Sequence, residues 1–130
     1  MYSKTAQVKK KKKRGKTWYR DKMDTLFSKI IRQRDERCQK CGNTNSLQCS
    51  HVIPKSQSLP LRWDNLNAKA LCLSCHLYWW HKDILAAQEW FTNTFPDRSK
   101  YLEEHRNDII KFSLDDYKEM YEKMQSEFTP

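Results

Sequence analysis

The sequence has no apolar run that approaches the roughly 20 residues needed to cross a bilayer. It also has no apolar segment near its N-terminus of the kind that secretory signals contain. We therefore expect an intracellular protein without membrane segments, in the cytoplasm of the host cell or in the nucleus if the host is eukaryotic. At 130 residues and 38% hydrophobic content, the chain is long enough for one domain with a small core.

Acidic residues are missing from the first twenty positions, which carry nine Lys and Arg residues. The other 110 residues carry 16 basic and 16 acidic residues, so the formal net charge of +9 comes from the N-terminus. A run of like charges repels itself and does not pack, which predicts a disordered arm over residues 1–17. Counterion release favours Lys and Arg on phosphates. We therefore expect nucleic-acid binding through these residues: Lys9, Lys10, Lys11, Lys12, Lys13, Arg14 and Lys16. A solubilising tail and a nuclear localisation signal are the alternatives.

Five cysteines are present, and four of them form two C-x-x-C pairs, CQKC and CLSC. In a reducing compartment such pairs indicate a metal site rather than disulfides. Because zinc takes four thiolates in a tetrahedron, we predict a structural Zn²⁺ held by Cys38, Cys41, Cys72 and Cys75, with a hairpin inserted between the two knuckles. Reduced structural cysteines are the alternative. The fifth, Cys49, is expected to be a small packed residue on a strand, with a ligand role as its alternative.

Hydrophobic spacing predicts a small α+β domain. Met23, Phe27 and Ile31 mark one face of a helix over residues 19–36, and Gly42 supplies the turn of the first knuckle. Short strands are expected in LQCSHVI and AKAL, with a loop containing two prolines between them. CLSCH opens a helix that continues through LYWWHK, whose Trp79 and Trp80 we assign to the core or a lid. Further helices are expected over residues 83–93, from Pro96, and after Ser113.

The order of these elements resembles the HNH endonuclease superfamily. The matching pieces are CQKCG, then SHVIP, then NAKALCLSCH, which follows the family's N-x-x-x-L-C-x-x-C-H form. SHVIPKSQSLPLRWDNLNAKALC also resembles the phage recombination endonucleases typified by NinG. The resemblance covers about residues 37–81. It implies a ββα-metal core in a treble-clef frame, within one domain over residues 18–130. The core would span about residues 37–82, and C-terminal helices would span residues 83–130.

The resemblance also implies a metal-dependent DNA endonuclease. His51 would be the general base, a role that suits a near-neutral imidazole pKa. Asn67 would hold the base strand by hydrogen bonds across the loop, with Asn65 as a rival for this position. His76 would hold a catalytic divalent metal such as Mg²⁺ or Mn²⁺. His81 is a second candidate ligand, although it lies five residues on rather than the four that align a helix face.

Arg62 and Ser50 leave further alternatives open. Arg62 could clamp a phosphate or pair with Asp64. Ser50 stands where many family members place an Asp or His as a second metal ligand, and a serine hydroxyl is a poor substitute. Ser50 therefore keeps open a treble-clef zinc module that binds nucleic acid without cutting it. A zinc-stapled protein–protein adaptor is a third hypothesis, which the basic arm makes less favourable.

Overall fold

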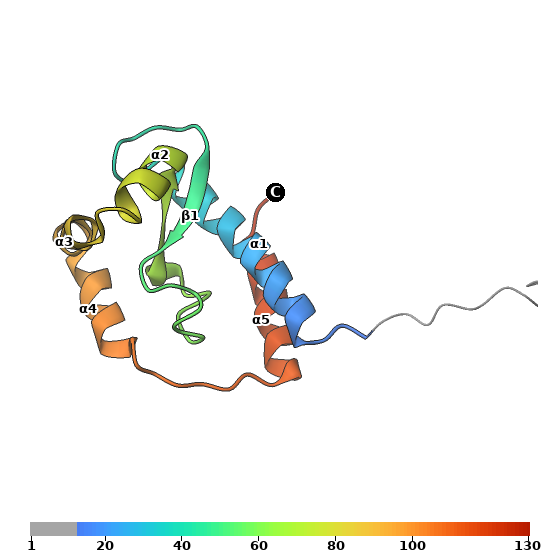
Figure 1. Ribbon diagram of the computed structural model, residues 1–130. Coiled ribbons are helices and arrows are strands. Elements are labelled where there is room, and N and C mark those ends of the chain that lie inside the picture. Colours follow the sequence, from blue (N-terminus) through green and yellow to red (C-terminus); the bar gives the residue numbers. More distant parts are fainter. Residues whose placement is uncertain (1–12) are drawn as a thin grey trace, which may run out of the picture.

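The computed structural model describes residues 13–130, and Lys9 to Lys12 of the expected arm lie outside them. Among the described residues, five α-helices surround a two-stranded antiparallel sheet (Figure 1). Helices α1 and α5 lie side by side on one side of the sheet, and α3 and α4 lie on the other (Figure 1). This arrangement confirms the predicted α+β class. In the part of the chain that is described, none of the helices has the length and hydropathy to cross a membrane.

Helix α1 (Lys16–Asp35) buries the predicted stripe: Tyr19, Met23, Phe27 and Ile31. The helix begins three residues before the predicted start and therefore takes in the last two residues of the expected arm. Packing explains the earlier start, because the Trp18 ring contacts both Tyr19 and Tyr121 edge-on. At its other end, Glu36 adopts a left-handed conformation (φ 64°), and its N–H closes the helix on Arg32.

Helix α5 (Leu114–Glu127) packs against α1 through Tyr117 and Met124. Ser113 caps it as predicted. Its hydroxyl accepts from the Asp116 N–H, and the Asp116 carboxylate accepts from the Ser113 N–H. Such a capping box satisfies two backbone donors that a helix start leaves free. Helices α1 and α5 thus pack against each other on one side of the sheet.

The sheet consists of β1 (Leu47–His51) and β2 (Ala68–Cys72), close to the predicted strands. The register places Ser50 opposite Lys69 and His51 opposite Ala68. The free edge of β2 is covered: the Ala70 N–H donates to the Asp35 carboxylate at 2.8 Å, and the Ala70 carbonyl accepts from Gln39 N at 2.9 Å. Edge coverage of this kind blocks pairing with a foreign strand and fixes the sheet to the end of α1.

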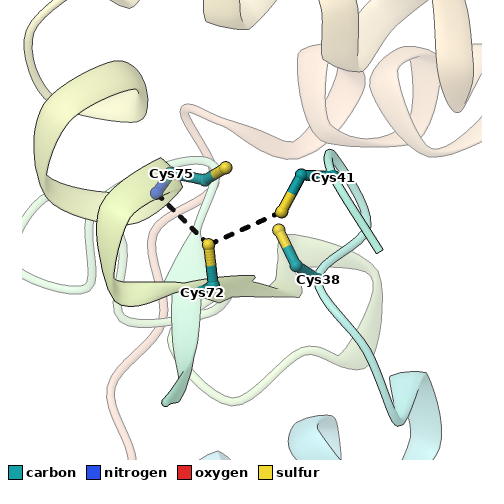
Figure 2. Close-up of side chains that lie close together, drawn as sticks. All are labelled: Cys38, Cys41, Cys72 and Cys75. Atoms are coloured by element: carbon teal, nitrogen blue, oxygen red, sulfur yellow. Dashed lines mark hydrogen bonds between the residues drawn. The ribbon is translucent and has the colours of Figure 1, made fainter. Parts of the chain in front are cut away.

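The segment after β2 turns directly into helix and brings the second knuckle beside the first. Helix α2 (Leu73–Cys75) continues into a π-helical turn, η2 (His76–Trp80). The four cysteine side chains converge from the two knuckles (Figure 2). Helices α3 (Ile84–Thr94) and α4 (Pro96–His105) follow, close to the predicted bounds.

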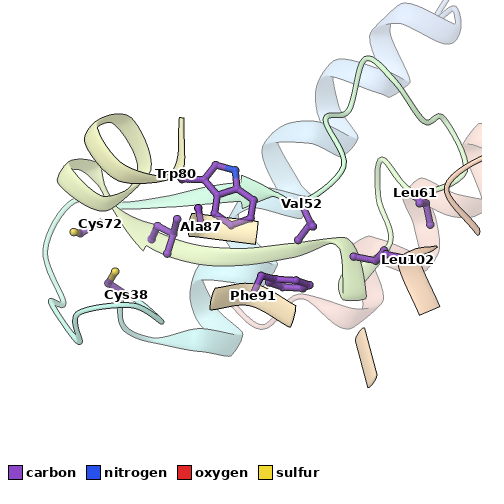
Figure 3. Close-up of a cluster of buried hydrophobic side chains, with 9 residues drawn as sticks. Cys38, Val52, Leu61, Cys72, Trp80, Ala87, Phe91 and Leu102 are labelled. Carbon is purple, nitrogen blue, oxygen red and sulfur yellow. The ribbon is translucent and has the colours of Figure 1, made fainter. Parts of the chain in front are cut away.

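A second core lies between the sheet and α3–α4. Trp80, Phe91 and Leu102 are buried there against Val52 and Leu61 (Figure 3). Cys38 and Cys72 form one end of this core, so the knuckles are packed into it rather than attached at its surface. Trp80 is a core residue, as predicted, while Trp79 packs half-buried against Trp90.

Candidate catalytic site and metal cluster

The four cysteine sulfurs lie within 4.8 Å of one another, and the Sγ atoms of Cys41 and Cys72 are 3.7 Å apart. Sulfurs bonded to zinc at about 2.3 Å lie about 3.8 Å apart in a tetrahedron. The cluster therefore has the chemistry and spacing to hold a metal such as zinc. Gly42, at φ +81°, closes the first knuckle by donating its N–H to the Cys38 carbonyl at 2.8 Å. This left-handed turn explains why a glycine stands there.

The thiols of the cluster have opposite pKa shifts. Burial would raise the pKa of Cys38, but backbone hydrogen bonds from Cys41, Cys72 and Lys40 outweigh it and bring the pKa down to about 7. Burial and the neighbouring thiols raise the pKa of Cys75. The protein surroundings thus favour the thiolate form of Cys38 and the thiol form of Cys75. A bound cation would favour the thiolate form of all four.

Cys49 stands apart from this cluster. It is half-buried on β1 and packs against the core between α1 and α5. Burial raises the pKa of its thiol to about 11, which keeps it protonated at neutral pH. Cys49 therefore has the packing environment predicted for it.

A groove of about 910 Å³ is lined in part by β1, and His51, His76 and His81 all contribute to its lining. His51 is the last residue of β1, and its ring packs beside the Phe27 ring. Its Nε2 lies 2.8 Å from the Arg62 carbonyl oxygen. Because a carbonyl can only accept, Nε2 carries the proton, and Nδ1 keeps a free lone pair in the neutral ring. Burial lowers the pKa of His51, so the neutral form predominates at neutral pH.

Asn67 organises the loop between the strands. Its side chain is fully buried, accepts from the Ile53 N–H at 2.8 Å, and donates to the Ile53 and Leu61 carbonyls at 2.9 and 3.0 Å. Its own carbonyl accepts from the Val52 N–H. Asn65 is exposed in the 3₁₀ turn η1 (Asn65–Asn67) and offers only its backbone carbonyl, to Arg34. Asn67, rather than its rival, thus bridges the loop.

His76 and His81 meet despite their five-residue spacing. The π-helical turn closes with a hydrogen bond from His81 N to the His76 carbonyl at 3.3 Å, which puts residues i and i+5 on one face. Their Nε2 atoms are 3.4 Å apart. Two ring nitrogens on one divalent ion lie about 3.0–3.4 Å apart, depending on the geometry. The pair therefore fits a shared metal.

The surroundings of His76 favour its neutral, ligand-competent form. Burial lowers the pKa of His76 to about 4, and repulsion between its imidazolium form and positive charge on His81, Lys69 or His51 acts in the same direction. Its Nδ1 is buried and has no hydrogen-bond partner. Within residues 13–130, the cysteine cluster is the single group of three or more potential metal ligands. A metal at the histidine pair would therefore take most of its ligands from water or substrate.

Ser50 is fully buried, and its hydroxyl accepts a hydrogen bond from Lys69 Nζ at 2.9 Å. The Lys69 ammonium lies over the Trp80 ring, and burial lowers its pKa well below the usual value. Ser50 is thus engaged with Lys69 across the sheet instead of facing a metal. The signal for this pair was present in the sequence as the single lysine of an otherwise apolar strand, AKALC.

Arg62 pairs with a residue that the sequence did not suggest. Its guanidinium binds Asp24 of α1, with Nε to Oδ1 at 3.0 Å and Nη2 to Oδ2 at 2.6 Å. The suggested partner, Asp64, instead accepts from the Leu66 N–H and the Tyr101 hydroxyl. Asp64 sits as the N-cap of η1, which explains why its carboxylate turns toward that short helix.

The described part of the expected basic arm precedes α1 and continues into its first residues. Lys13 and Lys16 are exposed, and the Arg14 guanidinium stacks 4.1 Å above the Trp18 ring. Stacking of this kind leaves the guanidinium edge open to an anion. The predicted phosphate contacts at Lys13, Arg14 and Lys16 are therefore sterically open.

Two strands, the helix that follows them and a four-cysteine cluster that could hold a metal define a small α+β domain. Residues 38–78 match the model of the HNH endonuclease family. The cysteine cluster is compatible with the zinc type of HNH domain. The match implies nuclease activity in general. It includes His51, Asn67 and His76 and ends before His81. No curated protein and no solved structure matched the chain.

Proposed function

We propose that the protein is a divalent-metal-dependent DNA endonuclease that hydrolyses phosphodiester bonds, with His51 as general base. The observation that carries this proposal is the hydrogen bond from His51 Nε2 to the Arg62 carbonyl. It leaves Nδ1 free to accept a proton, on a ring that lines the same groove as His76 and His81. A base needs a lone pair, a neutral form near pH 7 and access to water. The free Nδ1, the lowered pKa of His51 and its position in the groove support this role.

In the proposed reaction, His51 Nδ1 takes a proton from a water molecule as the water oxygen attacks phosphorus. The bond from phosphorus to the 3′ oxygen then breaks, and this oxygen takes up a proton from solvent, which leaves a 5′-phosphate and a 3′-hydroxyl. Asn67 keeps the base strand and the loop in fixed relation through Ile53 and Leu61. His76 and His81 would hold a divalent metal such as Mg²⁺ or Mn²⁺. When bound, such an ion neutralises the charge that develops on the phosphate and the leaving group.

The four cysteines have no step in this reaction. Their cluster lies at the opposite end of the core from Leu61 and Leu102 (Figure 3), and a zinc ion there would stabilise the fold. The basic residues at the N-terminus would bind DNA phosphates irrespective of sequence. Arg62 remains a candidate phosphate contact through Nη1, because Nε and Nη2 are occupied by Asp24.

The substrate structure is a further part of the proposal. SHVIPKSQSLPLRWDNLNAKALC resembles the phage recombination endonucleases, which favours branched or single-stranded DNA over a simple duplex. The comparison needs matched oligonucleotides: a four-way or three-way junction, a single strand and a duplex of the same sequence. Preferential cleavage of the branched or single-stranded forms is the expected result, and a preference for the plain duplex would contradict this assignment.

The central experiment incubates the protein with supercoiled plasmid and Mg²⁺ or Mn²⁺. We expect nicking or linearisation by the native protein and a loss of about 100-fold to 10,000-fold in His51→Ala, because the general base is removed. His105→Ala is the matched control, since His105 pairs with Asp108 outside the groove. Binding in a gel shift should be equal in all three proteins. Binding without cleavage in any divalent ion would instead establish the non-catalytic zinc module.

A further inference from the structure

Asp24 is a carboxylate of α1 that lies outside the matched segment but lines the same groove as His51. It accepts hydrogen bonds from Arg62 Nε at 3.0 Å, from Arg62 Nη2 at 2.6 Å, and from Trp63 Nε1 at 2.9 Å. Lys55 Nζ lies 3.6 Å from the same carboxylate. All of these donors belong to the loop between the strands. Asp24 is therefore the point at which this loop is tied to α1.

The contact is stronger than an ordinary surface ion pair. The guanidinium binds both carboxylate oxygens in a two-point arrangement, which fixes orientation as well as distance. Both side chains are largely buried, with exposed fractions of 19% for Arg62 and 21% for Asp24. The loop is also held from α5, because the Trp63 ring packs edge-on against Tyr117 at 5.8 Å. Arg62 thus has little freedom to move while Asp24 is present.

Arg62 links this anchor to the base. The side chain of Arg62 donates hydrogen bonds to Asp24, and the main-chain carbonyl of the same residue accepts one from His51 Nε2. Asn67 holds the preceding residue, Leu61, from the other side. The Arg62 carbonyl, which sets the His51 tautomer, is therefore held by two residues: Asn67 within the matched segment and Asp24 on α1.

We propose that Asp24 is a positioning residue for the base: acting through Arg62, it holds the carbonyl that keeps the proton on His51 Nε2 and leaves Nδ1 free. This inference rests on the proposed function of His51. Asp24 itself touches neither the attacking water nor the phosphate in this scheme. Its contribution is to keep one tautomer and one ring orientation populated, so its loss should reduce kcat rather than raise KM.

The charge state of Asp24 suits this role. Burial alone would raise the pKa of the carboxyl, but the hydrogen bond and charge of Arg62, together with Lys55, hold it below its ordinary value. Asp24 is therefore a carboxylate at neutral pH. Burial is the main influence on His51 and lowers its pKa, as do Lys55 from the loop and Lys69 from β2, whereas the Arg62 carbonyl and Asp24 raise it.

The kinetic test compares Asp24→Ala and Asp24→Asn with Asp21→Asn. Asp21 is an exposed carboxylate on the same helix, so its variant removes an equal charge without touching the loop. We expect kcat to fall about 10-fold to 100-fold in Asp24→Ala, the range seen when a partner that orients a functional side chain is removed. Asp24→Asn keeps one acceptor oxygen and should lose less. KM should not rise, and Asp21→Asn should match the native protein.

A double variant tests the route through Arg62. If Asp24 acts through that residue, combining Asp24→Ala with Arg62→Ala should cost no more than Arg62→Ala alone. Multiplying losses would mean that Arg62 contributes independently, for instance by holding a phosphate, and would overturn the proposed route. Zinc content and the thermal unfolding midpoint of each variant identify any that fail to fold, and Asp24→Asn then carries the comparison.

Nitrogen-15 spectra of the His51 ring provide a readout that does not need activity. The native protein should show the Nε2–H tautomer, and Asp24→Ala should show a mixture with a lower pKa of His51. An inactive native protein whose tautomer still depends on Asp24 would remove the proposed function but keep the positioning role. An unchanged tautomer in Asp24→Ala, or a KM effect with kcat intact, would overturn the inference.

Discussion

The cysteine cluster and the histidine pair occupy the two sides of one short turn, since Cys75 and His76 are adjacent in the chain. The cysteines supply four ligand atoms within 4.8 Å of one another, a complete tetrahedral set. The histidines supply two nitrogens 3.4 Å apart at the surface of a groove. Structural zinc sites are closed and catalytic metal sites keep open positions. The same turn therefore separates a ligand set suited to holding the fold from one suited to exchange with substrate.

Removing one cysteine ligand tests whether the cluster holds the fold together. Cys72→Ser should lower the free energy of unfolding by more than about 4 kcal/mol, because it removes a ligand of the metal and disrupts a buried part of the core. Zinc bound per chain, measured on purified protein, should fall from about one to near zero. Thermal or chaotrope unfolding followed by circular dichroism gives the change in stability.

Cys49→Ser is the matched control for this experiment. It makes the same chemical change on β1, outside the cluster, where a half-buried thiol becomes a hydroxyl. We expect a loss of about 1 kcal/mol and unchanged zinc content. A native protein that folds fully without zinc, or equal losses in both variants, would contradict the assignment of the cluster.

The cysteine cluster was predictable from the sequence because the residues that form it are marked by short local motifs. Two C-x-x-C pairs specify their ligands by spacing alone, and Gly42 marks the tight turn between Cys38 and the strand that follows. The helix boundaries were also close, since Ser113 and Pro96 carry strong start signals. Asn67 was preferred over Asn65 by its distance to the second knuckle, and its buried bridge to Ile53 shows why that spacing matters.

The groove with the histidine pair was less predictable because its contacts join residues that lie far apart in the sequence or depend on irregular local geometry. Regular α-helical geometry argued against pairing His76 with His81, and only the π-helical turn brings them together. Asp24 lies 38 residues from Arg62, and no spacing rule links a charged residue on one helix to a distant loop. The Ser50–Lys69 pair likewise depends on strand register, which an isolated strand pattern does not determine.

A smaller perturbation tests the open end alone. His81→Ala should weaken the binding of Mn²⁺ or Mg²⁺ by about tenfold or more, which corresponds to about 1.4 kcal/mol or more. It should leave zinc content and the unfolding midpoint close to native values, because His81 is exposed. Mn²⁺ binding can be followed by electron paramagnetic resonance, and zinc by elemental analysis.

His105→Ala is again the control, since it removes an imidazole outside the groove. It should leave Mn²⁺ affinity unchanged. Loss of zinc together with Mn²⁺ in His81→Ala would show that the two ends are not separable. Native Mn²⁺ affinity in His81→Ala would show that the imidazole pair is not the metal site, and the comparison between the two ends would then lose its chemical basis.

The protonation of His51 should make both activity and stability depend on pH. Burial lowers the pKa of His51 below 6.5, so its neutral form persists to a lower pH in the folded protein than in the unfolded chain. The acidic limb of kcat/KM, which reports the base in the free enzyme, should therefore have a midpoint below 6.5.

The free energy of unfolding should depend on the same group. As the pH falls from 6.5 toward the pKa of His51 in the folded protein, the unfolded chain binds the proton first. The contribution of His51 to the free energy of unfolding is then full above 6.5 and lost on acidification. His51→Gln should lack this part of the pH dependence, whereas the cysteine cluster, which loses metal to protons, should show the same acid lability in both proteins. A limb at or above 6.5 in the native protein would mean that the groove does not favour the neutral imidazole, and that another group limits the rate.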